Sequence, residues 1–448
     1  MAPFFFGSVD LVWVVCWTIA LAIAAGCGAG FELNVQQTLI FRGALGVFLC
    51  YAVVSAIQIL PLGLNNLNDP SWHRLNELLE LSVGPRISSR EKIPDIAIGH
   101  FFTFVLAFTN GFLLGTSREN SATLIKVARI SILAYAGYGL FALVFTPTTT
   151  LWATKSAYLG SFTTTFINHN TAGTLVGSGL ILWASSAVSS WEAIRTSSVR
   201  LLLLNPANEK LSFDVLFKTV GALVCFFALL SSGSRGALIS SCAGLLTLAL
   251  LIVGGRDKVS RKGLFFLALT GAVALMGWLL QIGRIASQGL VDEQRWSVYE
   301  LCLQSVQRRP WFGSGAGTFE DIFPSLRSPT FPSSGVWDHA HSTILEIAVE
   351  MGIPVAVIIA LAALATVFLL SRAAMQQSKS VAAPLAAIAG VAVLSYVHSL
   401  VDFSLQIPGY FIPFGILMGL GLARAASSPI SDARRRGQSP NAFAFNPD

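Results

Sequence analysis

The feature that most constrains this chain is a succession of apolar runs, each close to the roughly 20 residues that a helix needs to cross a bilayer. Hydrophobic residues make up 54% of its 448 residues and charged residues only 12%, which is too apolar for a protein surrounded by water. The runs are too long for strands and lack two-residue alternation, so helices rather than a barrel satisfy the backbone in lipid. The sequence therefore predicts an all-α, polytopic transmembrane helical bundle of about 11–12 helices. The expected spans are 9–29, 38–60, 98–116, 122–145, 170–187, 216–232, 236–253, 264–281, 342–370, 381–398 and 408–424.

The distribution of lysine and arginine predicts an orientation. The clusters Arg256–Lys262 and Arg434–Arg436 are expected to stay in the cytosol by the positive-inside rule. The segments 61–97 and 282–341 then lie on the outer side, together with the amino terminus. No cleavable signal is expected, because the first apolar segment has no basic stretch before it and no small-residue cleavage site.

The six cysteines do not predict a disulfide framework. Five of them lie inside apolar spans, where cysteine behaves as a small hydrophobic residue, and only Cys302 falls in an aqueous loop. No spacing typical of zinc ligands occurs. The tail after about residue 425 is polar and basic, and we expect it to be disordered.

The outer loop 282–341 is expected to contain a helix over 293–309, capped by Asp292 and stopped by Pro310. An amphipathic stripe on this helix would suit a position against the membrane or against the helical bundle. The stripe consists of Trp296, Tyr299, Leu303 and Val306. The segment 61–97 is a second polar excursion, with a short helix expected near 71–82.

The outer loop 282–341 carries five arginines but no lysine. This bias favours phosphate recognition, because the guanidinium fork matches phosphate oxygens. The alternative is that several arginines pair with the six acids of the loop. The arginines are Arg284, Arg295, Arg308, Arg309 and Arg327.

Arg235 stands in a very short polar break, 231–236, between two apolar spans on the outer side. A charge so close to the hydrocarbon is costly unless it reaches the interface or meets an anion, and no acid stands within the break. A phosphate ligand and a snorkelling anchor are both consistent with this position.

His339 and His341 lie two residues apart where the outer loop enters an apolar helix. A histidine here could act as a general base near neutral pH, whereas the alternative is that one or both cap the following helix. The glycine-rich run Gly313–Gly317 lies upstream. It follows a helix rather than a strand, so it does not predict a dinucleotide-binding site.

Two further polar groups occur at predicted span ends. His398 and Asp402 are four residues apart and are expected to share one helical face, more often as a structural pair than as a functional one. Asn168 and Asn170 open another span, either as a polar cap, which we favour, or as part of a sugar site.

The order of these motifs resembles the O-antigen ligase/polymerase family of bacterial envelope glycosyltransferases. The resemblance spans most of residues 160–425. The pieces that carry it are Ser232-Gly233-Ser234-Arg235-Gly236-Ala237, Arg295-Trp296, Pro310-Trp311-Phe312-Gly313-Ser314-Gly315-Ala316-Gly317-Thr318-Phe319, His339-Ala340-His341-Ser342, Leu345-Glu346-Ile347, Glu350-Met351-Gly352-Ile353-Pro354 and His398-Ser399-Leu400-Val401-Asp402-Phe403.

The resemblance implies a GT-C-like fold and inverting, metal-independent transfer of a glycan from undecaprenyl diphosphate. The expected acceptor is a sugar hydroxyl, on lipid A-core for a ligase or on a polysaccharide repeat unit for a polymerase. His341 resembles the essential histidine of the family, and Arg235 and Arg295 resemble its diphosphate-binding arginines. Ser342 departs from the family pattern, which often has Asn there, so the choice between His339 and His341 as the base stays open.

The resemblance also implies a multi-pass protein of the bacterial inner membrane, with a site that faces the periplasm. Ligase activity is preferred to polymerase activity, and a membrane transporter is a weaker alternative because no internal repeat occurs. No cofactor, metal or nucleic acid is expected. We divide the chain into N-terminal helices over 1–160, a ligase-like core over 161–425 and a basic tail over 426–448.

Overall fold

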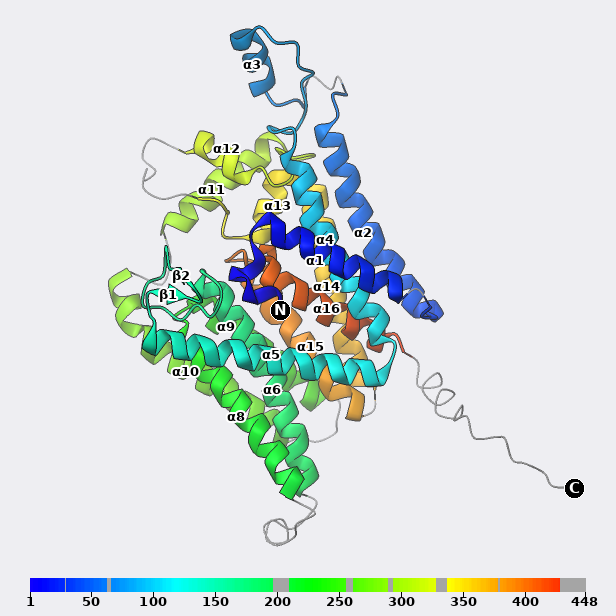
Figure 1. The fold of residues 1–448 in the computed structure, drawn as a ribbon, viewed down its shortest axis with the longest axis vertical. Coiled ribbons are helices and arrows are strands. Elements are labelled where there is room, and N and C mark those ends of the chain that lie inside the picture. Colours follow the sequence, from blue (N-terminus) through cyan, green and yellow to red (C-terminus); the bar gives the residue numbers. More distant parts are fainter. Residues whose placement is uncertain are drawn as a thin grey trace, which may run out of the picture.

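The computed structural model describes residues 1–28, 30–62, 66–195, 209–254, 261–288, 293–327, 337–377 and 379–427. Within these ranges the protein is a bundle of helices with one short hairpin, which confirms the predicted all-α class (Figure 1). Eight of the described helices are long and apolar enough to cross a membrane, and two shorter apolar helices accompany them. The chain is therefore a multi-pass membrane protein.

The first half of the chain begins with η1 (Ala2–Phe4) and η2 (Phe6–Ser8). It continues with α1 (Leu11–Cys27), α2 (Val35–Ile59), α3 (Ser71–Leu79), α4 (Ile93–Gly115), α5 (Arg118–Phe145), the antiparallel pair β1 (Thr149–Thr150) and β2 (Ala153–Thr154), and α6 (His169–Arg195). The second half contains α8 (Glu209–Ser231), α9 (Arg235–Gly254), α10 (Arg261–Gln288), α11 (Glu293–Arg308), α12 (Phe319–Leu326), α13 (Thr343–Met351), α14 (Ile353–Gln376), α15 (Lys379–His398), η4 (Ser404–Gln406) and α16 (Pro408–Ala425). Every predicted span corresponds to helix, and α3 and α11 match the two helices expected in the polar segments.

One predicted span, 342–370, is wrong as a single helix. The structure breaks it at Gly352 into α13 and α14. Gly352 has a φ of +84°, a conformation that side chains with a Cβ rarely adopt, and the backbone of Trp311 fills the space where a Cβ would stand. Pro354 follows in the first turn of α14, where its missing N–H costs nothing.

Segments that were predicted to share one side of the membrane do meet at one end of the bundle. This end, called the loop end below, comprises residues 66–92, 146–168, 232–234, 293–327, 337–346 and 399–407. The Arg309 guanidinium lies 2.7 Å from the Asp69 carboxylate, and the Thr343 N–H donates to the Ser399 carbonyl. The cytosolic or periplasmic assignment of this end stays a prediction. Two predictions, that Asp292 caps α11 and that the tail is disordered, concern Asp292 and residues 428–448, which lie outside the described ranges.

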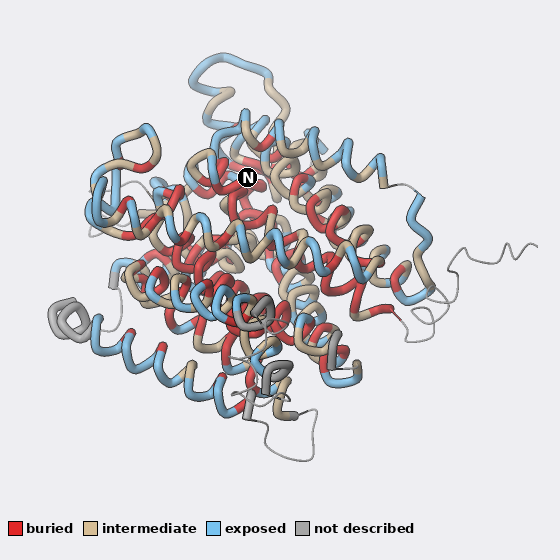
Figure 2. Tube along the Cα trace, turned by 60° about the horizontal axis from the view of Figure 1, so that its bottom comes forward, coloured by how far each residue is buried: buried red, intermediate tan, exposed pale blue. Residues whose placement is uncertain are grey.

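The helix α6 runs through the interior and is buried along nearly its whole length, as Figure 2 shows for the centre of the bundle. It is rich in glycine, serine and threonine, which allow close approach. A Cβ added at Gly173 would lie 2.7 Å from Ala237 of α9. Small residues at helix crossings replace the hydrophobic drive that is absent between helices in lipid.

The tightest described crossing joins α4 and α16. A Cβ at Gly111 would overlap the backbone of Ile416, and a Cβ at Gly419 would overlap the backbone of Phe108. Neither helix backbone can move away easily, because α16 is buried on nearly all sides. Glycine is therefore required at both positions for packing rather than for backbone conformation.

We expect Gly111→Ala to lower the free energy of unfolding by about 1–3 kcal/mol, since the added methyl group must push two backbones apart. The apparent Tm of the purified protein in detergent, followed by size-exclusion chromatography after heating, measures the effect. Gly99→Ala on the same helix is the matched control, because a Cβ there meets nothing within 4 Å. Equal Tm values for the two variants would contradict this account of the crossing.

Candidate functional site

The turn Trp337–Ser342 carries the two histidines into α13. His341 has a φ of +54°, an uncommon conformation for a residue with a side chain. Ser342 occupies the N-cap position of α13, so neither histidine caps the helix as the alternative interpretation proposed. The turn is held instead by contacts from outside it, because the Tyr299 hydroxyl donates to the His341 carbonyl at 3.0 Å.

A buried carboxylate, Glu346, organises this turn from the first turn of α13. One of its oxygens lies 2.9 Å from His339 Nδ1 and accepts from Gln406 Nε2 at 2.9 Å. The other oxygen accepts the Ala340 N–H at 2.7 Å. A buried carboxylate is costly without such donors, so the arrangement fixes His339 relative to the turn that contains Gln406.

The two histidines have opposite protonation states at neutral pH. Burial alone would lower the pKa of His339, but the charge of Glu346 and its hydrogen bond outweigh burial and raise the pKa to about 9. Burial lowers the pKa of His341 to about 3, and the positive charges of Arg295 and His339 act in the same direction. His339 is therefore an imidazolium and His341 a neutral imidazole.

The ring of His341 is enclosed by aromatic side chains. Trp337 lies 5.3 Å away and Phe403 lies 5.0 Å away between ring centroids, both edge-on, while His339 stacks on the same Phe403 at 4.3 Å. His341 Nδ1 is buried and has no hydrogen-bond partner in the described part of the chain. An unpaired acceptor or donor in such surroundings is available to a ligand.

The helix α11 brings Arg295 near His341, whose pKa the arginine lowers. The Arg295 Nη1 atom donates to the Val401 carbonyl at 2.7 Å. Tyr299, which contacts His341, follows one turn later on the same helix. The predicted stripe of α11 is only partly right. Trp296 and Leu303 are exposed, whereas the buried face consists of Val298, Cys302 and Val306.

Arg235 is the first residue of α9, and Ser234 caps that helix by accepting the Ala237 N–H. The following residue, Gly236, packs against the same turn that Arg295 contacts. A Cβ on Gly236 would lie 3.3 Å from both His398 Nε2 and the Val401 side chain. The neighbour of Arg235 and the side chain of Arg295 therefore both contact one short turn, 398–401.

His398 and Asp402 lie together, but not on one helical face, so this prediction is wrong in its geometry. The helix α15 ends at His398, and Asp402 lies in the turn beyond it. His398 Nδ1 lies 3.1 Å from Thr174 Oγ1, and its Nε2 has no described partner. Burial raises the pKa of Asp402 to about 6, against the opposing effects of the Phe403 N–H and Arg295.

Asn168 caps the start of α6, as we favoured, whereas the Asn170 side chain is hydrogen-bonded to Asp402. Asn168 Oδ1 accepts the Asn170 N–H at 2.7 Å. His169 between them stacks on Tyr158 at 4.5 Å and lies 2.8 Å from the Ser232 carbonyl. Arg284 lies in the last turns of α10, and its side chain is outside the described part of the structure.

The glycine-rich run is a structural clamp. The Glu350 carboxylate accepts the N–H groups of Gly317 and Phe319, both at 2.9 Å. Gln58 of α2 accepts the Ala316 N–H and donates to the Glu350 carbonyl. Burial and the charge of Glu346 raise the pKa of Glu350. The clamp joins α2, α12 and α13, and it explains these glycines without a phosphate ligand.

Gln406 was not singled out from the sequence, and Glu346 and Phe403 were named only within the resembling motifs, without a role. Glu346 lies in the first turn of an apolar helix. Acids are common there because they interact favourably with the helix dipole, so the sequence gives no sign that this one is buried. Phe403 and Gln406 lie about 60 residues further along, and only the fold brings them to the histidines.

Comparison with known proteins assigns this region to a family. Residues 220–360 match the family model Wzy_C, described as O-antigen ligase. This match confirms the family resemblance, and it includes Arg235, Arg295, both histidines and Glu346. No curated protein matches the chain. The protein thus carries a segment that is similar to the O-antigen ligase family.

We expect Glu350→Ala to release the glycine-rich clamp, because it removes the acceptor of two N–H groups. The Phe319 N–H is buried, so leaving it unpaired costs about 1–3 kcal/mol. Hydrogen–deuterium exchange should then become faster over residues 313–319 than in the unchanged protein. Glu300→Ala, which removes an exposed acid from α11, is the control and should leave that exchange unchanged. Unaltered exchange in Glu350→Ala would contradict the clamp.

Proposed function

We propose that this protein is an inverting glycosyltransferase that moves a glycan from undecaprenyl diphosphate to a sugar hydroxyl at the periplasmic face of the inner membrane. Lipid A-core is the favoured acceptor, which makes it an O-antigen ligase. The observation that supports this most is the neutral His341, which has an unpaired ring nitrogen and lies close enough to Arg295 for that positive charge to lower its pKa. The family match over residues 220–360 supports the reaction class.

In this mechanism His341 is the general base. It takes the proton from the acceptor hydroxyl while the acceptor oxygen bonds to the anomeric carbon from the face opposite the diphosphate. The bond from the anomeric carbon to the phosphate oxygen breaks, and undecaprenyl diphosphate leaves with the electron pair. Inversion at the anomeric carbon follows from this single displacement.

The arginines bind the diphosphate. Arg235 and Arg295 supply forked guanidinium groups, which stabilise the negative charge that grows on the leaving oxygen. Arg284 is a third candidate from the sequence. A bound diphosphate also offsets the positive charge of Arg295, one of the groups that lower the pKa of His341, so donor binding makes this imidazole a stronger base.

His339 is proposed as a positioning residue rather than the base. Its imidazolium is fixed by Glu346 and stacked on Phe403, which is also the ring that borders His341. Four polar residues at the ends of α6 and α15 are further candidates for glycan contact or structural support. They are Asn168, Asn170, His398 and Asp402. All of the proposed site residues lie within the proposed ligase-like core, residues 161–425.

Individual replacement tests the catalytic scheme in a strain that lacks the endogenous gene. His341→Ala is expected to lower glycan transfer by roughly 10²–10⁴-fold, since a positioned base contributes about that much. Arg235→Ala and Arg295→Ala are expected to lower it by roughly 10²–10³-fold through lost charge stabilisation. Arg295→Lys keeps the charge but not the fork, and should recover only part of the activity.

The readout is surface polysaccharide on a gel beside extracted prenyl-linked glycan, with expression of each variant confirmed. Long prenyl-linked polymer accumulates if the enzyme is a ligase, and single repeat units accumulate if it is a polymerase. His73→Ala and Arg308→Ala are exposed loop-end controls and should give wild-type profiles. Wild-type profiles from all three site variants would reject the scheme and favour a transporter or a scaffold protein.

The pH dependence of kcat/KM tests the two protonation states, because this ratio reports groups of the free enzyme. With the pKa of His341 at about 3, no acid limb is expected between about pH 5 and 8. A fall above about pH 9 is expected as His339 loses its proton. Glu346→Gln removes the charge that raises the pKa of His339, so the alkaline limb should move to lower pH, whereas Glu300→Gln should leave it in place. Burial also raises the pKa of Asp402 to about 6, so only an acid limb near the ordinary histidine pKa that persists in Asp402→Asn would count against the buried, neutral His341.

A further inference from the structure

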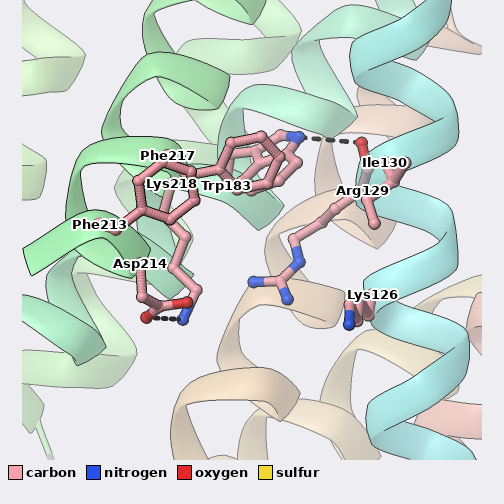
Figure 3. A pocket seen from close by; sticks show the side chains of 8 residues that line it. All are labelled: Lys126, Arg129, Ile130, Trp183, Phe213, Asp214, Phe217 and Lys218. Atoms are coloured by element: carbon pink, nitrogen blue, oxygen red, sulfur yellow. Dashed lines mark hydrogen bonds and ion pairs between the residues drawn. The ribbon is translucent and has the colours of Figure 1, made fainter. Parts of the chain in front are cut away.

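A second feature lies away from the loop end. A cavity of about 830 Å³ opens between α5, α6 and α8 (Figure 3). It reaches Trp183 of α6, which is 13 residues beyond Asn170 and therefore about 20 Å further along that helix. The cavity is thus separate from the histidine turn. It lies toward the end of the bundle that the positive-inside rule assigns to the cytosol.

The charged lining of this cavity is mainly basic. Lys126 and Arg129 come from α5, and Lys218 comes from α8. Lys218 lies 2.6 Å from the Asp214 carboxylate, which neutralises one of the three positive charges. The described lining therefore retains a net positive charge, and Figure 3 shows the Arg129 guanidinium projecting between α5 and α8.

Arg129 is held in place by Trp183, and the charge of Asp214 also acts on it. Its guanidinium lies over the Trp183 ring at 5.1 Å, and Trp183 Nε1 donates to the Arg129 carbonyl at 2.9 Å. The Arg129 Nε atom is buried and has no hydrogen-bond partner in the described part of the chain. A guanidinium stacked on an aromatic ring, with an unused donor, is preorganised for an anion.

The rim of the cavity is apolar and exposed. Ile130, Phe213 and Phe217 line it, with 43%, 68% and 41% of their surfaces exposed. A soluble anion gains nothing from such a rim, whereas an amphiphile places its headgroup on the cations and its acyl chains along the apolar helices. Basic pockets between membrane helices on the cytoplasmic side recognise anionic lipid headgroups in this way.

We propose that this cavity binds the phosphate headgroup of an anionic glycerophospholipid, such as phosphatidylglycerol, from the adjoining membrane leaflet. Arg129 and Lys126 hold the phosphate, and Phe213 and Phe217 border the upper acyl chains. Lys218, already paired with Asp214, forms the far wall. The site is distinct from the proposed glycan-transfer site and does not depend on that function.

Native mass spectrometry of the full-length protein in a mild detergent tests this site, with phosphatidylglycerol and phosphatidylcholine of matched acyl chains as probes. The wild type is expected to retain phosphatidylglycerol preferentially. The double variant Lys126→Gln/Arg129→Gln should bind it roughly tenfold to thirtyfold more weakly, and Lys126→Gln alone roughly fivefold. Arg118→Gln is the matched control, because it removes an exposed charge from α5 outside the cavity lining and should change nothing.

A competition arm separates the lipid from a soluble anion. Inorganic phosphate and glycerol 3-phosphate, at the same concentration, should not displace bound phosphatidylglycerol. Displacement by either would overturn the lipid assignment in favour of a soluble phosphate ligand. Lys126→Gln, which alters an exposed side chain, keeps the test valid where the double variant is poorly folded. Wild-type lipid preference in Lys126→Gln and in a folded double variant would overturn the site altogether.

Discussion

The buried carboxylate of Glu346 is the interaction on which the loop end depends. It joins the histidine turn, through His339 and Ala340, to Gln406 in the segment that follows α15. Removing a buried carboxylate from its donors, or the donors from it, leaves an uncompensated charge or unsatisfied polar groups, each costly in a low-dielectric interior. The same charge also makes the pKa values of the two histidines differ. It raises the pKa of His339, whereas burial lowers the pKa of His341.

Lipid imposes the second constraint, since apolar surface alone cannot bring helices together in a solvent that is itself apolar. The bundle meets this constraint with helices in close contact, as at Gly173 of α6 and Gly390 of α15. Such crossings tolerate little movement. The start of α6 and the end of α15 are therefore rigid supports, and the polar groups at their tips, Asn170 and His398, are held at fixed positions near the histidine turn.

The sequence was sufficient for the helices and for most of the candidate residues, because membrane spans and interrupted polar motifs are local signals. It was insufficient where an interaction is tertiary. The four-residue spacing of His398 and Asp402 indicated a shared helical face, but α15 ends at His398 without a glycine or proline to announce it. The apolar residues of α11 occupy more than one face, so periodicity alone chose Leu303, which is exposed, over Cys302, which is buried. The burial of Glu346 depends on partners up to 60 residues away.

The break at Gly352 has a mechanical consequence. The membrane helix α14 can change its tilt with bilayer thickness, as spans do when their length and the lipid differ. The start of α14 is fixed, however, because its first N–H donates to the Pro310 carbonyl and Gly352 packs against the backbone of Trp311. A change of tilt is therefore expected to be taken up further along α14, while the short helix α13 keeps the direction that its loop contacts give it.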